Sequence, residues 1–253
     1  YHLHKSSRNN MNLWEKIHFW HRAWRYRLIS EKFGVSFLLQ SKLQGQTVLD
    51  IGANRGIFSY WMHKKVGFNG KVIAFEPQPE LHHELHDLRA AFSLSRLEIA
   101  NVGLSSTTKK MKMYRPKNHW GAASVETGES NESLEKIEVD VITLDSFLDR
   151  EVASSVKFIK CDVEGHEFDV LQGGVETIKR GKPDILFECH DAMNPNCKPF
   201  ELLHSIDYRG FCFFNGGMTP IENYARLREK GRLHRKTFTD FVFVPKERSN
   251  QLR

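Results

Sequence analysis

Short apolar segments recur along most of the chain and alternate with longer stretches of helical periodicity. The segments are rich in β-branched and aromatic residues and mostly end at turn residues, as buried strands do. This alternation predicts an α/β domain over residues 46–247, with a mostly parallel, doubly wound, seven-stranded sheet that binds ligands at the carboxyl ends of its strands. The expected strands are residues 47–51, 71–76, 97–104, 156–162, 184–190, 211–215 and 239–244.

Residues 1–45 follow a different pattern and are expected to form a helical arm. Asn12 and Glu15 have the spacing of a capping box, which predicts a helix start. Beyond it, apolar residues recur at helical intervals on one face and basic residues lie on the other. The apolar stripe is Leu13, Ile17, Trp20, Trp24 and Leu28, and the basic face is Lys16, Arg22, Arg25 and Arg27.

Three interpretations of this helix stay open. The first is that the tryptophan-rich stripe packs on the domain or on another subunit, with the basic face solvated. The second is a lid over the pocket that would bind an acceptor substrate. The third is peripheral attachment of residues 12–33 to an anionic membrane surface or glycolipid, because basic amphipathic helices bind interfaces. We expect no nucleic-acid partner, since no RNA-binding module is recognisable.

The alternation changes between residues 105 and 142. Residues 110–114 and 137–142 look like strands, and the link between them, residues 117–134, is long, polar and contains glycine. Such links are often functional. We interpret this one as either an acceptor-binding flap or a mobile insertion.

Composition agrees with a single enzyme domain. The 253 residues, 40% of them hydrophobic, can bury a sizeable core but do not accommodate a second full domain. The net charge of +6 lies entirely in residues 1–46, which hold eight Lys or Arg and two Glu. No apolar run reaches about eighteen residues, so no membrane span is expected. The four cysteines include no Cys-x-x-Cys pair, which favours free thiols and a reducing, cytoplasmic setting.

The segment 48–56 resembles a nucleoside-cofactor site. An apolar strand breaks there into a turn with Gly52 and Gly56, where the missing side chains let a ligand approach the backbone. The next strand ends on Glu76, whose carboxylate can accept hydrogen bonds from both hydroxyls of a ribose. We place Asn101, after the third strand, near the adenine.

Charge distinguishes the two cofactors that such a site could hold. The turn has Ala53 and Asn54 where a dinucleotide site has its second glycine, and Asp50 points its carboxylate toward the same crevice. One charge pair at about 5 Å is worth roughly 3 kcal/mol at an effective dielectric of about 20. Asp50 therefore repels a pyrophosphate and attracts the ammonium and sulphonium of S-adenosylmethionine. A nicotinamide-dependent oxidoreductase on a similar fold is the alternative.

Acids and histidines gather at the tips of the strands that end near residues 162 and 190. If strand geometry persists, Asp162 and Glu164 share a face, as do Glu188 and His190. A hydroxyl attacks a methyl carbon poorly until its proton is being removed, so a base is needed. We favour His190, with Asp162 or His166 as substitutes. A rival activator is Mg²⁺ or Mn²⁺ bound by Asp162 and Glu188.

Four motifs together resemble the FkbM family of S-adenosylmethionine-dependent methyltransferases over roughly residues 46–245. The specific part is the Asp-Val-Glu-Gly-x-Glu element at residues 162–167, because most methyltransferases share the glycine turn. The chain departs from the usual small residue after Gly165, where it has His166. The motifs are residues 50–56, 75–77, 160–167 and 185–190.

This resemblance implies a Rossmann-like methyltransferase fold in which the last strand, residues 239–245, is an antiparallel edge strand. It also implies O-methylation of a hydroxyl, often on a sugar, glycolipid or polyketide. We therefore expect a small-molecule or glycan acceptor of sugar-containing or secondary-metabolite type. An oligomer is compatible with this expectation.

Overall fold

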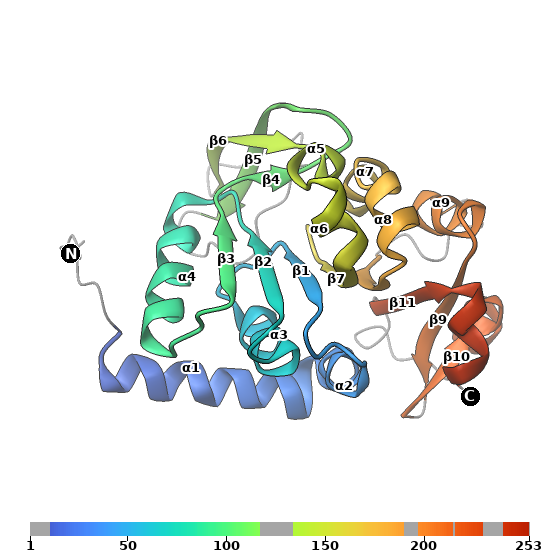
Figure 1. The fold of residues 1–253 in the computed structure, drawn as a ribbon, viewed down its shortest axis with the longest axis horizontal. Helices are drawn as coiled ribbons and strands as arrows, with labels where there is room; N and C mark the ends of the chain where they lie inside the picture. Colours follow the sequence, from blue (N-terminus) through green and yellow to red (C-terminus); the bar gives the residue numbers. More distant parts are fainter. Residues whose placement is uncertain (1–10, 117–133, 190–196, 215, 230–239, 253) are drawn as a thin grey trace.

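A mixed sheet of eight strands forms the centre of the described chain (Figure 1). The computed structural model describes residues 11–116, 134–189, 197–214, 216–229 and 240–252. The strand order is β10-β9-β11-β8-β7-β1-β2-β3, and β11 and β10 run antiparallel to their neighbours. The strands are β1 (Thr47–Ile51), β2 (Lys71–Phe75), β3 (Leu97–Ala100), β7 (Val156–Cys161), β8 (Asp184–Glu188), β9 (Tyr208–Phe214), β10 (Gly217–Pro220) and β11 (Asp240–Pro245).

Three expectations about the sheet are wrong. It has eight described strands rather than seven, because β10 folds back on β9. The last strand is not at an edge: β11 lies between β8 and β9, and five of its six residues are buried. A strand covered on both faces must be apolar throughout, which explains its sequence. The segment 97–104 is divided between β3 and β4, which belong to different sheets.

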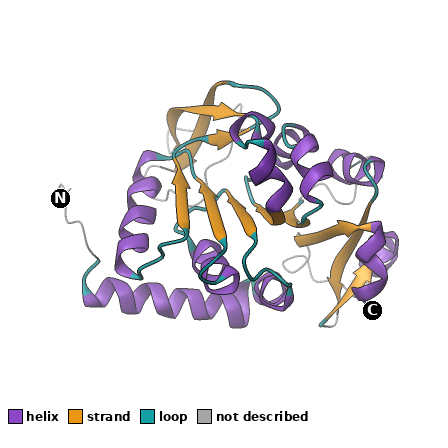
Figure 2. Ribbon diagram, in the orientation of Figure 1, coloured by secondary structure: helices purple, strands orange, loops and turns teal. Residues whose placement is uncertain are grey.

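Helices cover both faces of the sheet, as Figure 2 shows. Alternate strand residues face opposite sides, so the strands contribute to two cores. Val48, Val72 and Phe158 belong to the core packed by the N-terminal helices, and Leu49 and Ile159 belong to the other. The first face carries α1 (Leu13–Arg25), the π-helical turn η1 (Tyr26–Ser30), α2 (Lys32–Gln40), α3 (Ile57–Val66) and α4 (Pro79–Ala91). The later helices are α5 (Leu144–Phe147), α6 (Arg150–Ser155), α7 (Glu167–Gln172), α8 (Val175–Gly181), α9 (Lys198–Ser205), η2 (Ile221–Asn223), α10 (Tyr224–Glu229) and η3 (Lys246–Leu252).

Helix α1 begins where the capping box predicts. The Asn12 side chain accepts a hydrogen bond from the Glu15 amide at 3.0 Å, and Glu15 accepts one from the Asn12 amide at 2.8 Å. The predicted stripe does not pack on the domain, because Phe19 and Ala23 are buried while the stripe is exposed. Its packing on another subunit stays a prediction. No helix of the described residues is both long and apolar enough to cross a membrane.

A second, three-stranded sheet lies above the carboxyl end of β2 (Figure 1). Its strands, in the order β4-β6-β5, are β4 (Gly103–Leu104), β6 (Leu134–Ile142) and β5 (Lys109–Pro116). The two strands predicted in this region are confirmed. The flap predicted at residues 117–134 lies outside the described residues except for Leu134, which begins β6. Buried Arg115 donates two hydrogen bonds to Glu80, at 2.7 and 2.9 Å, which fasten β5 to α4.

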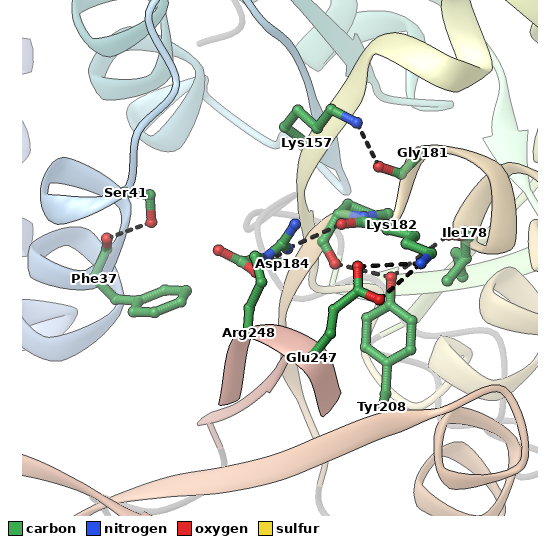
Figure 3. A network of polar contacts seen from close by, with 11 residues as sticks. Phe37, Ser41, Lys157, Ile178, Gly181, Lys182, Asp184, Tyr208, Glu247 and Arg248 are labelled. Atoms are coloured by element: carbon green, nitrogen blue, oxygen red, sulfur yellow. Dashed lines mark hydrogen bonds and ion pairs between the residues drawn. The ribbon is translucent and has the colours of Figure 1, made fainter. Parts of the chain in front are cut away.

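A polar network near the amino end of β8 holds the C-terminal helix η3 (Figure 3). Arg248 donates to the Lys182 carbonyl oxygen at 2.9 Å and to the Asp184 carboxylate at 2.5 Å. The Tyr208 hydroxyl donates to the Pro183 carbonyl oxygen at 3.0 Å. The chain end is therefore attached to the side of the sheet opposite the ligand-binding edge.

Candidate active site

A pocket of about 280 Å³ opens at the carboxyl ends of β1, β2, β7 and β8, where the strand pattern predicts a ligand site. Gly52 and Asn54 follow β1, Glu76 follows β2, Asp162 follows β7 and Glu188 ends β8. The parallel register places these strand ends side by side. Five of the residues expected at the site therefore line one cavity.

The turn after β1 depends on glycine for two different reasons. Gly52 has a φ of +74°, and a Cβ there would lie 1.9 Å from the Asp162 carbonyl oxygen. It thus permits close approach of the β1 and β7 tips beside the pocket. Gly56 does not line the pocket: it precedes α3, and a Cβ there would meet the side chains of Leu85 and Leu88. In this structure Gly56 packs against α4, and its assignment as a cofactor contact stays a prediction.

Glu76 lies where a ribose-binding carboxylate is expected, at the tip of β2. It is 3% exposed and accepts hydrogen bonds from the amides of Asn54 at 2.9 Å and Gln78 at 3.0 Å. Burial raises the pKa of Glu76 to about 7, although these two amides oppose the shift. Asn101 is exposed and does not line this pocket, whereas Gly103, two residues further along the chain, does.

Asp50 lines a smaller adjoining cavity of about 110 Å³ rather than the main pocket. Gly52 and Asn54 line both cavities. The Asp50 carboxylate is buried, and one oxygen accepts a hydrogen bond from the Ser59 hydroxyl at 2.6 Å. Its other oxygen meets no hydrogen-bond donor among the described residues. Burial raises the pKa of Asp50, and Lys160 opposes this.

Lys160 is held by acids. It lies opposite Asp50 in the β1–β7 register, and its ammonium donates to Asp162 at 2.5 Å. Burial lowers the pKa of Lys160, but the charges of Asp162 and Asp50 outweigh it, and the pKa is raised. Lys160 therefore stays charged and is a counter-ion rather than a nucleophile.

Two acids beside this lysine come from segments that the sequence did not connect to the site. Glu31 follows η1, and Asp240 begins β11 opposite Glu188. Burial raises the pKa of Glu31 to about 8, and the charge of Asp240 adds to the shift. Burial likewise raises the pKa of Asp240 to about 6 against the opposing charge of Lys160. Tyr26 and Glu31 line both cavities, so the N-terminal segment forms part of the wall.

The loop after β7 turns sooner than expected. β7 ends at Cys161, and Glu164 and Gly165 have φ angles of +52° and +96°. Strand geometry therefore does not persist to Glu164, so the expectation that Asp162 and Glu164 share a strand face is wrong. The buried carboxylate of Glu167 accepts hydrogen bonds from the amides of Val163 at 3.1 Å and Gly165 at 3.2 Å, which fix the turn.

His166 lines the pocket at the start of α7 and is held between two polar groups. Its Nε2 lies 3.0 Å from the hydroxyl of buried Ser105, and its Nδ1 lies 3.6 Å from the Asp169 carboxylate. Asp169 in turn accepts a hydrogen bond from Ser106 at 2.6 Å. These contacts engage both ring nitrogens and fix the ring at the pocket wall.

The two other proposed activators of the acceptor hydroxyl are His190 and a divalent metal ion. His190, our first choice of base, lies outside the described residues. Asp162 and Glu188 both line the pocket, but no three His, Cys, Asp or Glu among the described residues are placed to hold a metal ion. The four cysteines are buried, and the sulfur atoms of Cys189 and Cys197 lie 3.3 Å apart. The cytoplasmic setting inferred from the cysteines stays a prediction.

One apolar wall of the pocket was not predicted. It is made by Met111 and Met113 of β5, Val141 of β6, and Leu104 and Pro77. Met111 and Met113 alternate along the strand and so share a face. The second sheet thus adds an adaptable apolar surface, suited to a flat ring, to a pocket otherwise rich in acids.

Fold and site together define the class: a Rossmann-like α/β domain with the glycine turn, the β2 acid and the acidic pocket of an S-adenosylmethionine-dependent methyltransferase. Residues 50–212 match the family described as Methyltransferase FkbM domain. Because this match covers more than half of the chain, the chain belongs to the FkbM methyltransferase family.

Two solved structures share the fold. Methyltransferase FkbM from Methylobacillus flagellatus KT is 17% identical with a TM-score of 0.55, and the match covers 93% of this chain and 56% of that one. The O-methyltransferase TomG from Streptomyces achromogenes, involved in tomaymycin synthesis and solved with S-adenosylmethionine, is 12% identical with a TM-score of 0.50. That match covers 90% of this chain and 89% of TomG. No curated protein matches the chain.

Proposed function

We propose that the chain transfers a methyl group from S-adenosylmethionine to a hydroxyl of a sugar-containing or secondary-metabolite acceptor. The observation that carries this proposal is the charge of the pocket wall. Among the described residues that line it are five carboxyl groups and no Lys or Arg. Glu31 is protonated near neutral pH because its pKa is about 8, and Asp162 is paired with Lys160. The remaining carboxyl groups favour a sulphonium cation, and no lysine or arginine of the described lining would attract the pyrophosphate of a nicotinamide dinucleotide. The five are Glu31, Glu76, Asp162, Glu164 and Glu188.

The residues present fit this cofactor part by part. Glu76 would accept the ribose hydroxyls, and the wall of Met111, Met113 and Val141 would receive the adenine. The buried Asp50 oxygen that lacks a described donor fits the amino group of the methionine moiety. The assignments of Gly56 and Asn101 as cofactor ligands have no such support.

When bound, S-adenosylmethionine supplies a methyl group made electrophilic by the sulphonium. The chain's residues must then position the acceptor hydroxyl and take its proton. His190 stays our predicted base. His166 of the pocket wall is the described alternative, and its Nε2 would take the acceptor's proton only after its contact with Ser105 opens. Activation by Mg²⁺ or Mn²⁺ at Asp162 and Glu188 also stays a prediction, and metal dependence would show as turnover lost to a chelator and restored by either ion.

Isothermal titration calorimetry tests the cofactor. We expect the purified chain to bind S-adenosylhomocysteine and S-adenosylmethionine and to give no heat of binding with NAD. Above the Glu76 pKa of about 7, Glu76→Gln should weaken both complexes at least about tenfold, because the ribose loses a charged acceptor. Binding of NAD in place of S-adenosylhomocysteine would instead establish the oxidoreductase alternative.

Transfer of labelled methyl from S-adenosylmethionine to molecules of a cell extract, followed by mass spectrometry, tests the reaction. We expect label on a hydroxyl oxygen, with turnover reduced about 10²-fold or more in the variant that removes the base. His190→Gln and His166→Gln should be compared with His83→Gln, which alters an exposed histidine of α4. If both test variants bind S-adenosylhomocysteine and turn over like His83→Gln, neither histidine is the base. Label on nitrogen or carbon would reject O-methylation.

A further inference from the structure

The first helix and the turn after it present an apolar strip to solvent. The strip runs from Leu13 to Leu28 and follows the helical repeat, and Trp14 and Ile29 add to the exposed apolar surface at 80% and 73% exposure. Its members are Leu13, Ile17, Trp20, Trp24 and Leu28, which are 72, 50, 53, 44 and 59% exposed. Single exposed apolar residues are ordinary, but a contiguous strip of this kind marks an interaction surface.

The strip cannot turn inward, because the opposite side of α1 is already fixed. The Phe19 ring packs against those of Phe92 and Tyr60, with centroids 5.1 and 5.5 Å apart. The Ala23 carbonyl oxygen accepts a hydrogen bond from the indole nitrogen of Trp61 at 3.3 Å. In Figure 1, α1 lies along the lower edge of the molecule, and no other labelled element lies below it.

The exposed charges that residues 11–33 themselves contribute are positive, whereas Glu84 and Asp87 of α4 share a hollow with Arg22 and Arg55 at one side of α1. Residues 11–33 are all described, and neither of their two acids is exposed: Glu15 closes the capping box and Glu31 lies at the pocket wall. Arg25 is exposed beside the strip, and the Arg27 guanidinium lies 4.8 Å from the ring centre of Trp24. The solvent side of this segment thus combines aliphatic and indole groups with cations and exposes no carboxylate.

We propose that residues 12–33 dock on the interface of a membrane that contains anionic lipids. Indole rings favour the headgroup level of a bilayer, aliphatic side chains enter its acyl boundary, and Lys and Arg attract anionic headgroups. α1 has 13 residues, about 20 Å of helix, which suits a helix lying in the membrane plane and not one crossing it.

Charge argues against a second copy of the chain as the occupant of this surface. A two-fold symmetric contact through the strip would place the same patch on both sides, so Arg25 and Arg27 would face their own copies. The neighbouring acids Glu84 and Asp87 lie with Arg22 and Arg55, and Glu84 is already paired with Arg55. An anionic lipid surface neutralises the same cations.

Co-flotation of the chain with lipid vesicles tests this proposal. We expect binding to vesicles of phosphatidylcholine mixed with phosphatidylglycerol, loss of binding at high salt, and much weaker binding to pure phosphatidylcholine. The triple variant Leu13→Ala, Ile17→Ala, Trp20→Ala should bind the anionic vesicles at least about tenfold more weakly. Alanine favours the helix, so the thermal unfolding midpoint of the triple variant and its affinity for S-adenosylhomocysteine should stay near those of the unaltered chain.

Charge reversals provide the matched comparison. Arg25→Glu should weaken binding to anionic vesicles, whereas Lys109→Glu, on exposed β5 of the second sheet, should not. Failure of the unaltered chain to float with anionic vesicles would overturn the proposal, as would equal flotation of the triple variant. A concentration-dependent dimer in analytical ultracentrifugation that the triple variant abolishes, with no vesicle binding, would assign the strip to a second copy instead.

Discussion

Gly52 lies where one added atom, a Cβ, would disturb the ligand site. The residue has a left-handed φ, and it also lies against the backbone after β7, where a methyl group would overlap the Asp162 carbonyl oxygen. Gly45 has nearly the same φ, +75°, but nothing lies within 4 Å of a Cβ placed there. Substitutions at the two glycines therefore distinguish the free-energy cost of the left-handed backbone from the cost of the close approach.

We expect Gly52→Ala to lower the affinity for S-adenosylhomocysteine at least about tenfold, because the tips of β1 and β7 must move apart. Gly45→Ala should retain the affinity and lower the free energy of unfolding by only about 1–2 kcal/mol, the usual cost of a left-handed alanine. Calorimetric titration and denaturant unfolding measure the two quantities. Equal affinities in the two variants would show that the close approach does not shape the site.

The sequence identified those pocket residues that follow strand ends. Gly52, Glu76 and Asp162 could be placed there because a parallel sheet brings its carboxyl ends to one edge. Glu31 could not be placed at the site from the sequence. It lies in a helix turn about 130 residues before Lys160, and nothing in that turn indicates contact with this lysine. Met111 could have been found, because it alternates with Met113 in a predicted strand.

At the scale of elements, pairing across long sequence separations escaped prediction. The apolar run of β11 was recognised as a strand, but apolarity does not specify which neighbours it pairs with. Its register, with Phe241 opposite both Phe187 and Cys212, places it inside the sheet. Short-range signals did better: the capping box of α1 and the strands β5 and β6 were predicted close to their observed limits.

The attachment of η3 allows a test at this scale. Asp184 is mostly buried, burial raises its pKa, and Arg248 opposes the shift. Arg248→Ala should lower the free energy of unfolding by about 1–2 kcal/mol, a figure discounted because the Arg248 side chain is 35% exposed. Glu247→Ala removes only the exposed pair with Lys182 and should change stability much less. Urea unfolding measures the free energy of unfolding of both variants. Equal losses would mean that Arg248 does not stabilise the buried carboxylate of Asp184.

At the scale of the whole molecule, a cluster of charges joins segments from both ends of the chain. Glu31 of the N-terminal segment meets Asp240 of β11 beside Lys160 of β7, and Asp50 of β1 shares the same lysine. The acids outnumber the lysine, so their burial is only partly compensated. The N-terminal segment is therefore coupled to the sheet through groups whose protonation depends on pH.

This coupling gives stability a direction with pH. The pKa of Glu31 in the folded chain, about 8, lies above its ordinary value of 4.5, so unfolding releases a proton between these values. The stability that protonated Glu31 contributes at low pH is lost as pH rises through this window, by at most about 1.4 kcal/mol per pH unit. Asp240 acts in the same sense over a lower range, up to about pH 6.

Glu31→Gln removes the titrating group and keeps the shape of the side chain. We therefore expect the free energy of unfolding of this variant to fall less steeply with pH than that of the unaltered chain, so that the difference between them shifts in favour of the variant between pH 4.5 and about 8. Guanidinium unfolding followed by tryptophan fluorescence across that range measures both slopes. Glu98→Gln, at an exposed position of β3, is the control and should leave the slope unchanged. Parallel slopes for Glu31→Gln and the unaltered chain would mean that Glu31 is ionised in the folded protein, and the cluster would then hold one more negative charge beside the pocket.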